Sequence, residues 1–255
     1  MNFIKTLLRS TLLQYNQEMK RSRSLLVGAT LSLVPIIFLI MVVKKGDVAD
    51  PKDLYIGLFV FLYAGISIIF LSLLNGIGIY QRELEGGTVP FMLDVPMKRS
   101  AIHISKYFSS VLFQLTFLLP SALISYSILM REFGERLNGG EGVAPLVIMV
   151  VGGVVVYTAF FSLLSLVAPK PLLVAFLYSI FWEYMVGLST LRMRKATVMF
   201  YLKSLIINSV MKTGEYGGGE KLAGTMSAIY SLFLAGAVGV ALGAIVMSIK
   251  NFEKS

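Results

Sequence analysis

Residues 81–106, QRELEGGTVPFMLDVPMKRSAIHISK, form a polar connector between two long apolar segments. Gly86 and Gly87 are expected to end the helix that arrives from upstream, because glycine adopts left-handed or extended backbone without a steric penalty. Thr88 can cap a new helix, and Pro96 would stop it, since proline lacks the backbone N–H that a helix interior needs. The stretch therefore predicts about two turns of apolar helix outside the membrane. Such a short helix needs a surface on which to dock.

The composition indicates that most of the chain is embedded in a membrane. Of its 255 residues, 56% are hydrophobic and only 15% are charged, and the mean hydropathy is +0.78. Soluble domains carry roughly a quarter of charged residues, so the sequence predicts an all-α integral membrane protein. The net charge of +9 suits contact with anionic lipid headgroups, and no nucleic-acid module is recognisable. Cysteine is absent, which excludes disulfides and thiolate metal sites.

Six segments are predicted to span the membrane, because each reaches the roughly 20 residues that are needed to cross it. They form a six-span domain over residues 24–255. Only the fifth span contains a charged residue, Glu183, and Pro35 and Pro120 are expected to kink their spans. The predicted spans are residues 24–43, 54–80, 107–130, 143–168, 171–191 and 225–249.

Small and polar residues inside the spans predict how the helices meet. Ala235, Gly239 and Gly243 recur at four-residue spacing, so this face of the last span is expected to pack closely on another helix. Six polar residues either line a path through the membrane or form hydrogen bonds between helices. They are Asn75, Gln114, Ser121, Ser125, Thr158 and Ser162.

Residues 1–23 are predicted to form an amphipathic helix in the membrane interface. Lys5, Arg9 and Lys20 lie off the apolar stripe, where they can meet headgroups. A plain lipid anchor is the alternative interpretation. The stripe consists of Phe3, Ile4, Leu7, Leu8, Thr11, Leu12, Tyr15 and Met19.

At this point the residues of the connector resemble a known family. Glu83, Gly87-Thr88, the apolar run to Pro96, Arg99 and Lys106 are similar to the signature of type 2 ATP-binding-cassette (ABC) exporter permeases. The resemblance implies that this loop couples the permease to a groove of a separate ATPase subunit. An ordinary amphipathic cytoplasmic loop is the alternative. The implied coupling residues are Glu83, Glu85, Gly87, Thr88, Phe91, Met92, Leu93, Asp94, Pro96, Arg99 and Lys106.

The resemblance also implies partners and an orientation. Two copies of the ATPase would bind ATP and Mg, and two permease subunits, identical or homologous, would pair around the substrate path. This chain lacks the G-x-x-x-x-G-K-[ST] phosphate loop, so it is not expected to be an enzyme itself. Lys and Arg divide almost evenly between the two sides, and the resemblance therefore decides the expected orientation, with both termini cytoplasmic in the cell membrane.

Residues 192–224 form the second informative connector. They contain a helical apolar stripe and then a glycine-rich turn at 214–219. In the resembling permeases, short helices at this place dip back into the membrane and roof the pathway. A helix lying flat on the outer leaflet is the alternative. The stripe consists of Val198, Met199, Leu202, Leu205, Ile206 and Val210.

Glu183 is a functional hypothesis by default, because a charged group inside a membrane span is costly. It could line the substrate path, or serve as the coupling acid of an ion-coupled secondary transporter, which is the alternative function. Two structural interpretations compete with these. Glu183 could lie in the outer interface beside Trp182 and Tyr184, or pair with Arg192, Arg194 or Lys203.

An intramembrane enzyme is a further, disfavoured class. The spans contain no clustered His or Cys and no paired carboxylates. His103 is the only histidine, so it lacks the partner that a metal site or a catalytic triad would need. Residues 137–141, LNGGE, resemble the ABC signature sequence but lie in a predicted outer turn.

Overall fold

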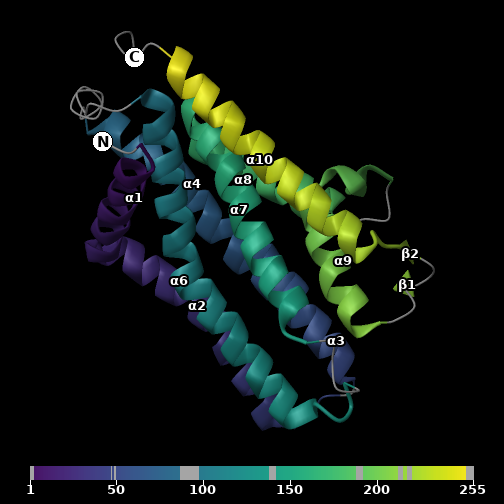
Figure 1. Cartoon of the computed structure of the whole chain (residues 1–255). Helices are drawn as coiled ribbons and strands as arrows, with labels where there is room; N and C mark the ends of the chain where they lie inside the picture. Colours follow the sequence, from purple (N-terminus) through teal and green to yellow (C-terminus); the bar gives the residue numbers. More distant parts are fainter. Residues whose placement is uncertain are drawn as a thin grey trace.

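A computed structural model of the chain shows an elongated bundle of helices (Figure 1). It describes residues 3–46, 48, 50–86, 98–137, 142–187, 192–211, 215–216 and 220–250. The only strands among these residues are β1 (Glu215–Tyr216) and β2 (Glu220–Lys221), which pair as a short antiparallel hairpin. The described part is therefore all-α apart from this turn.

Two helices build the first part of the chain. α1 (Phe3–Lys20) is followed at once by α2 (Ser22–Lys45), which ends at Gly46 with φ of 70°. Such a left-handed residue is a common helix stop, and glycine adopts it without strain. The next three elements form one continuous rod: α3 (Pro51–Ile56), the π-helical η1 (Gly57–Ile68) and α4 (Ile69–Glu85).

The rest of the chain alternates long and short helices. α6 (Arg99–Phe133) and α7 (Ala144–Val167) are long, and α8 (Pro171–Leu177) continues into the π-helical η2 (Tyr178–Val186). The last elements are the 3-10 helix η3 (Arg192–Ala196), α9 (Val198–Val210) and α10 (Thr225–Ile249).

Among the described residues, five helices are long and apolar enough to cross a membrane. The chain is therefore a multi-pass membrane protein of the all-α class. The predicted span at 171–191 corresponds to a shorter apolar helix, Pro171–Val186. The five long helices are Ser22–Lys45, Pro51–Gln81, Arg99–Phe133, Ala144–Val167 and Thr225–Ile249.

The third long helix differs from its prediction at its start. α6 begins at Arg99 and not at residue 107, so Arg99 and Lys106 lie within a helix, although the sequence placed them in the connector. α4 continues past the predicted span to Glu85, and Gly86 follows it as a turn residue, so the prediction that the upstream helix ends at this glycine is confirmed. The connector between the two helices is therefore shorter than expected, running only from 86 to 98. The end of α4 and the start of α6 lie beyond the apolar segments, and the residues added there include charged ones.

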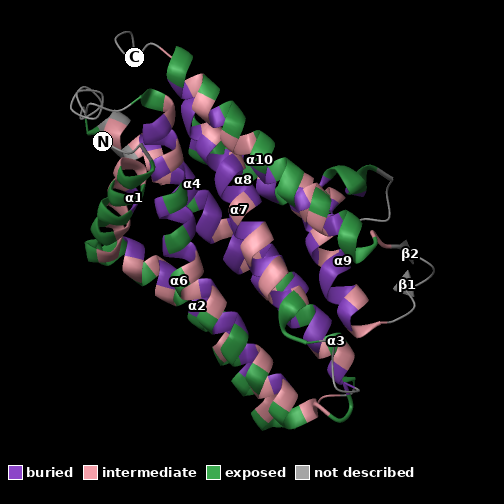
Figure 2. Cartoon of the chain, viewed as in Figure 1, coloured by how far each residue is buried: buried purple, intermediate pink, exposed green. Residues whose placement is uncertain are grey.

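The core lies along α7, η1 and α4, as the purple ribbons of Figure 2 show. Tyr63, Tyr157 and Phe161 are among the largest fully buried side chains. In contrast, α2 and α10 expose long rows of apolar residues, for example Phe233 at 76% and Ile249 at 77%. Such surfaces suit contact with lipid tails, which take the place of water around a membrane protein.

Gln114 of α6 connects three helices through buried hydrogen bonds. Its carbonyl oxygen accepts a 2.7 Å bond from the hydroxyl of Ser72, and its amide donates to Thr158 at 2.9 Å. All three residues are fully buried. Gln114 and Thr158 therefore hold the helices together, as one of the two interpretations of the sequence expected.

Tyr63 of η1 forms a second buried network. Its hydroxyl forms hydrogen bonds of 2.7 Å with Ser121 and 2.8 Å with Ser125, both on α6. Two further polar residues bond only within their own helices: the hydroxyl of Ser162 donates to Ala159 O, and the amide of Asn75 donates to Leu71 O.

The glycines of α10 allow it to approach its neighbours closely. A Cβ atom on Gly239 would lie 2.9 Å from Ala159, and one on Gly236 would lie 2.9 Å from Val155. A Cβ on Gly243 would overlap with the ring of His103. Ala235 is exposed, so the prediction that it belongs to the packed row of small residues is wrong. The packed row consists of residues 236, 239 and 243, because the helix turns 3.6 residues per turn and not four.

Replacing Gly243 by alanine is expected to lower the free energy of unfolding by about 1–3 kcal/mol, since an added methyl group has no space beside His103. Thermal unfolding in detergent measures the effect. Gly57→Ala is the matched control, because Gly57 is helical and its added Cβ would meet nothing within 4 Å. Equal stability of the two variants would contradict the close packing of α10 on α6.

α9 lies inside the bundle beside α7, α10 and η1. Thr197 caps its start by accepting a hydrogen bond from Phe200 N at 3.3 Å. Leu202 and Ile206 are fully buried. These contacts favour a helix that enters the bundle over one that lies flat on the membrane surface.

Candidate functional site

The first candidate site lies where α4 ends and α6 begins. The proposed coupling helix itself falls outside the described residues, which skip 87–97. Seven predicted coupling residues lie in this gap: Gly87, Thr88, Phe91, Met92, Leu93, Asp94 and Pro96. Glu85 ends α4, and Glu83, Arg99 and Lys106 can be placed by their contacts.

Two residues of α4 meet two residues of α6 and form what we call the base cluster: Tyr80, Glu83, His103 and Lys106. The ammonium of Lys106 forms an ion pair with Glu83 and also donates to Ile79 O at 3.3 Å. The Tyr80 hydroxyl forms a 2.7 Å hydrogen bond with Nδ1 of His103, and their rings are stacked. The cluster therefore fastens together the two helices that flank the connector.

The electrostatics of the base cluster favour a fixed arrangement. The Lys106 side chain is only 11% exposed, and its ammonium lies 5.3 Å from the centre of the Tyr80 ring. Removing one partner of a largely buried ion pair leaves an uncompensated charge, which costs several kcal/mol. Glu83 and Lys106 are thus expected to stay together.

α10 contacts the same region from another side. A guanidinium nitrogen of Arg99 donates to Lys250 O at 3.1 Å, which joins the start of α6 to the end of α10. Tyr80 packs with Met247 of α10 and Leu166 of α7 in a small buried cluster. A displacement of the connector would therefore act on α4, α6 and α10 together.

α1 is attached to α6 by polar contacts next to the base cluster. The hydroxyl of Ser105 contacts Ser10, Thr11 and Gln14, and Tyr15 forms a 3.1 Å hydrogen bond with Thr116. Thr11 and Tyr15 of the predicted apolar stripe therefore contact α6, and not lipid. Four apolar residues of α1 remain exposed, namely Ile4, Leu8, Leu12 and Leu13.

Sequence reasoning missed Tyr80, His103 and Ser105 as parts of this site. A signal was present, because Tyr80 and Glu83 are three residues apart, as are His103 and Lys106. Residues at this spacing lie on one face of a helix. A single sequence does not show that these two faces meet, since the contact depends on how α4 and α6 pack.

The second candidate site surrounds Glu183 of η2. Its carboxyl group is fully buried and accepts four hydrogen bonds. Two come from hydroxyls, Tyr157 at 2.9 Å and Tyr178 at 2.6 Å. Two come from backbone amides at the start of α9, Val198 at 3.2 Å and Met199 at 2.8 Å. Glu183 therefore caps α9 and connects it to η2 and α7.

This geometry favours one of the interpretations of Glu183 over the others. Full burial of Glu183 argues against the interpretation that it lies in the outer membrane interface. The four donors are neutral groups, and neither Arg194 nor Lys203, two of the ion partners that the sequence offered, is among them. The side chain of the third, Arg192, lies outside the described part of the chain. The N-terminus of a helix carries a partial positive charge and unpaired N–H groups, which a buried acid satisfies. The arrangement favours a structural role.

No three His, Cys, Asp or Glu side chains of the described residues lie together as metal ligands would. No family model matches this chain, and no curated protein or solved structure matches it significantly. The fold therefore defines the class, an all-α multi-pass membrane protein, and the more specific function below is a proposal.

Proposed function

We propose that this chain is the membrane-spanning permease subunit of an ATP-driven ABC exporter, with its ATPase on a separate subunit. The carrying observation combines sequence and geometry. The signature-like residues Glu83 and Lys106 pair at the base of the connector, and Arg99 joins the start of α6 to the end of α10. A connector that docks on an ATPase needs fixed contacts of this kind at its base, because they transmit its movement to the membrane-spanning helices.

The contacts of α1 support the same function. α1 lies beside the base cluster through Ser105 and exposes Ile4 and Leu8 on its apolar side. An amphipathic helix of this kind lies at the membrane surface. In the proposed complex it would sit next to the ATPase, with its basic residues toward the lipid headgroups.

Six crossings are supported by the positions of the helix ends. The starts of α1 and α6 and the end of α10 lie at the same end of the bundle (Figure 1), and Arg99 contacts Lys250 O there. A chain that begins and ends on one side crosses an even number of times. The five long helices and Pro171–Val186 together supply six crossings, although the latter is about 24 Å long and shorter than a typical span.

The proposed transport cycle follows from this arrangement. Two permease subunits, identical or homologous, assemble about a two-fold axis with the substrate path between them. Two ATPase subunits bind ATP and Mg, and their closure moves the connector as a lever. The base cluster passes this movement to α4 and α6, and the spans turn from inward-facing to outward-facing.

Glu183 gives little support to the alternative of an ion-coupled transporter. A coupling acid must gain and lose a proton and needs access to a pathway, whereas both oxygens of Glu183 already accept hydrogen bonds from protein groups. Releasing those bonds would also uncap α9. The structural role therefore explains the acid without a transport function for it.

Co-expression with candidate ABC ATPase subunits from the same genome tests the proposal. We expect one ATPase subunit to co-purify with the chain. The rate at which this ATPase hydrolyses ATP should change when the complex forms in liposomes. An ATP-independent flux through the purified chain alone, driven by a proton or sodium gradient, would contradict the exporter and favour the secondary transporter.

The orientation can be tested with two single-cysteine variants, because the natural chain has no cysteine. Lys98→Cys and Glu132→Cys lie near opposite ends of α6, and both positions are exposed. With cytoplasmic termini, a membrane-impermeant thiol reagent should label only residue 132 in intact cells and both positions in permeabilised cells. Labelling of residue 98 alone in intact cells would invert the topology.

A further inference from the structure

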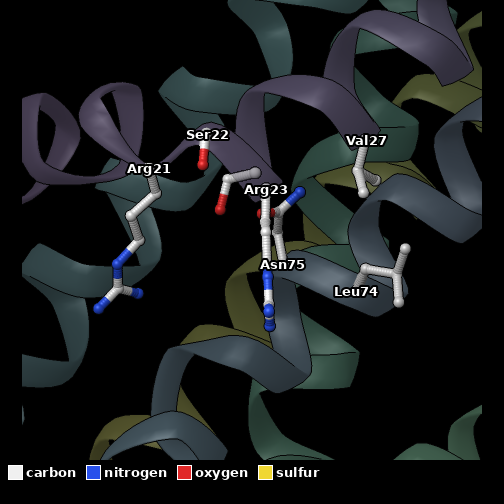
Figure 3. Close-up of a pocket in the computed structure, with 7 residues that line it drawn as sticks. Arg21, Ser22, Arg23, Val27, Leu74 and Asn75 are labelled. Carbon is white, nitrogen blue, oxygen red and sulfur yellow. The ribbon is translucent and has the colours of Figure 1, made fainter.

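A pocket of about 530 Å³ lies between the start of α2 and the middle of α4. Figure 3 shows its lining, with Arg21 and Arg23 extending in the same direction and Val27 and Leu74 lying together to one side. Asn75 lies behind Arg23 in this view. The pocket therefore has a cationic side and an apolar side.

The cationic side carries more positive than negative charge. Arg21 lies 3.4 Å from Glu18, which also accepts a 3.1 Å hydrogen bond from Ser24. Arg23 forms no ion pair with any of the described residues, and its side chain is exposed. Two guanidinium groups thus meet one carboxylate, and an anion beside Arg23 would balance the excess.

The start of α2 adds to this preference for an anion. α2 begins at Ser22, and its first backbone N–H groups have no partner within the helix. The residue before it, Arg21, forms no side-chain cap. Helix starts carry a partial positive charge, which favours a phosphate group.

The apolar side of the pocket and the level of its arginines in the membrane point to a lipid. α2 has 24 residues and is therefore about 36 Å long, with Arg21 and Arg23 near one end and Lys44 and Lys45 at the other. This length places the arginines at the level of lipid headgroups. Val27 and Leu74 lie on the side of the pocket that an acyl chain would follow into the membrane.

We propose that this pocket binds one membrane phospholipid with an anionic headgroup. Its phosphate contacts Arg21 and Arg23, and one acyl chain lies over Val27 and Leu74. The bound lipid fills the space between the start of α2 and α4. This site does not depend on the proposed transport function, since it needs only a membrane of suitable composition.

Native mass spectrometry of the purified full-length chain tests the site. The probes are phosphatidylglycerol and phosphatidylcholine with identical acyl chains, which differ in net charge. We expect one phosphatidylglycerol to remain bound at least about tenfold more tightly than phosphatidylcholine, as a charge-assisted contact would give. Arg21→Gln with Arg23→Gln should remove this preference, and Arg23→Gln alone should weaken it.

A matched control variant removes two positive charges at another place on α2. Lys44→Gln with Lys45→Gln lies at the other end of α2 and should keep the preference. Glycerol phosphate, which has the headgroup but no acyl chain, should not displace the lipid at millimolar concentration. Equal binding of the two lipids, an unchanged Arg21/Arg23 variant, or displacement by glycerol phosphate would each overturn the lipid site. Thermal unfolding of every variant shows that it is folded.

Discussion

Replacing Glu183 by glutamine is expected to lower the free energy of unfolding by roughly 2–5 kcal/mol. The glutamine NH₂ group occupies the place of one oxygen but cannot accept hydrogen bonds. Each oxygen of Glu183 accepts from one tyrosine and one backbone amide, so two buried donors lose their acceptor. Each orphaned buried donor costs about 1–3 kcal/mol. Denaturant or thermal unfolding in detergent measures the loss.

Two further variants show whether the loss comes from this contact. Glu132→Gln makes the same chemical change at an exposed position of α6, and its stability should stay within about 0.5 kcal/mol of the natural chain. Tyr178→Phe removes a single donor and should cost about 1 kcal/mol. If Glu183→Gln is as stable as Glu132→Gln but changes transport, Glu183 lines the path and does not serve as a structural cap.

Replacing Phe91 and Met92 together by alanine is expected to uncouple the proposed exporter. If the coupling helix docks in a groove of the ATPase, each side chain contributes roughly 1.5–3 kcal/mol through buried apolar surface. The loss of both weakens the contact by at least about a hundredfold. Co-purification of the ATPase and substrate-dependent ATP turnover should both fall, while membrane insertion of the permease is unchanged.

The matched control replaces two exposed apolar residues within a span. Leu26 and Met41 of α2 are each 67% exposed, so Leu26→Ala with Met41→Ala removes similar apolar surface on the membrane side. This control should keep both the ATPase and its turnover. Normal coupling in the Phe91/Met92 variant would show that the connector is an ordinary loop, and the proposed function would then lose its main support.

The sequence by itself determined the class and most of the helices. Long apolar segments must pair all their backbone groups internally in a membrane, and helices satisfy this requirement locally. The last span was therefore predicted with its observed bounds, Thr225–Ile249, and the fourth to within one residue at each end. The start of α6 was placed too late, because hydropathy shows where a helix leaves the apolar region and not where its hydrogen bonds end.

Only the tertiary structure decided which residues form the two candidate sites. Glu183 was visible in the sequence as an acid inside a predicted span, but its donors come from η2, α7 and α9, and no local pattern joins them. The pairs Tyr80–His103 and Glu83–Lys106 likewise need the contact between α4 and α6. Side-chain partners are set by how helices pack over long sequence separations, whereas the helices themselves follow from local hydrophobicity.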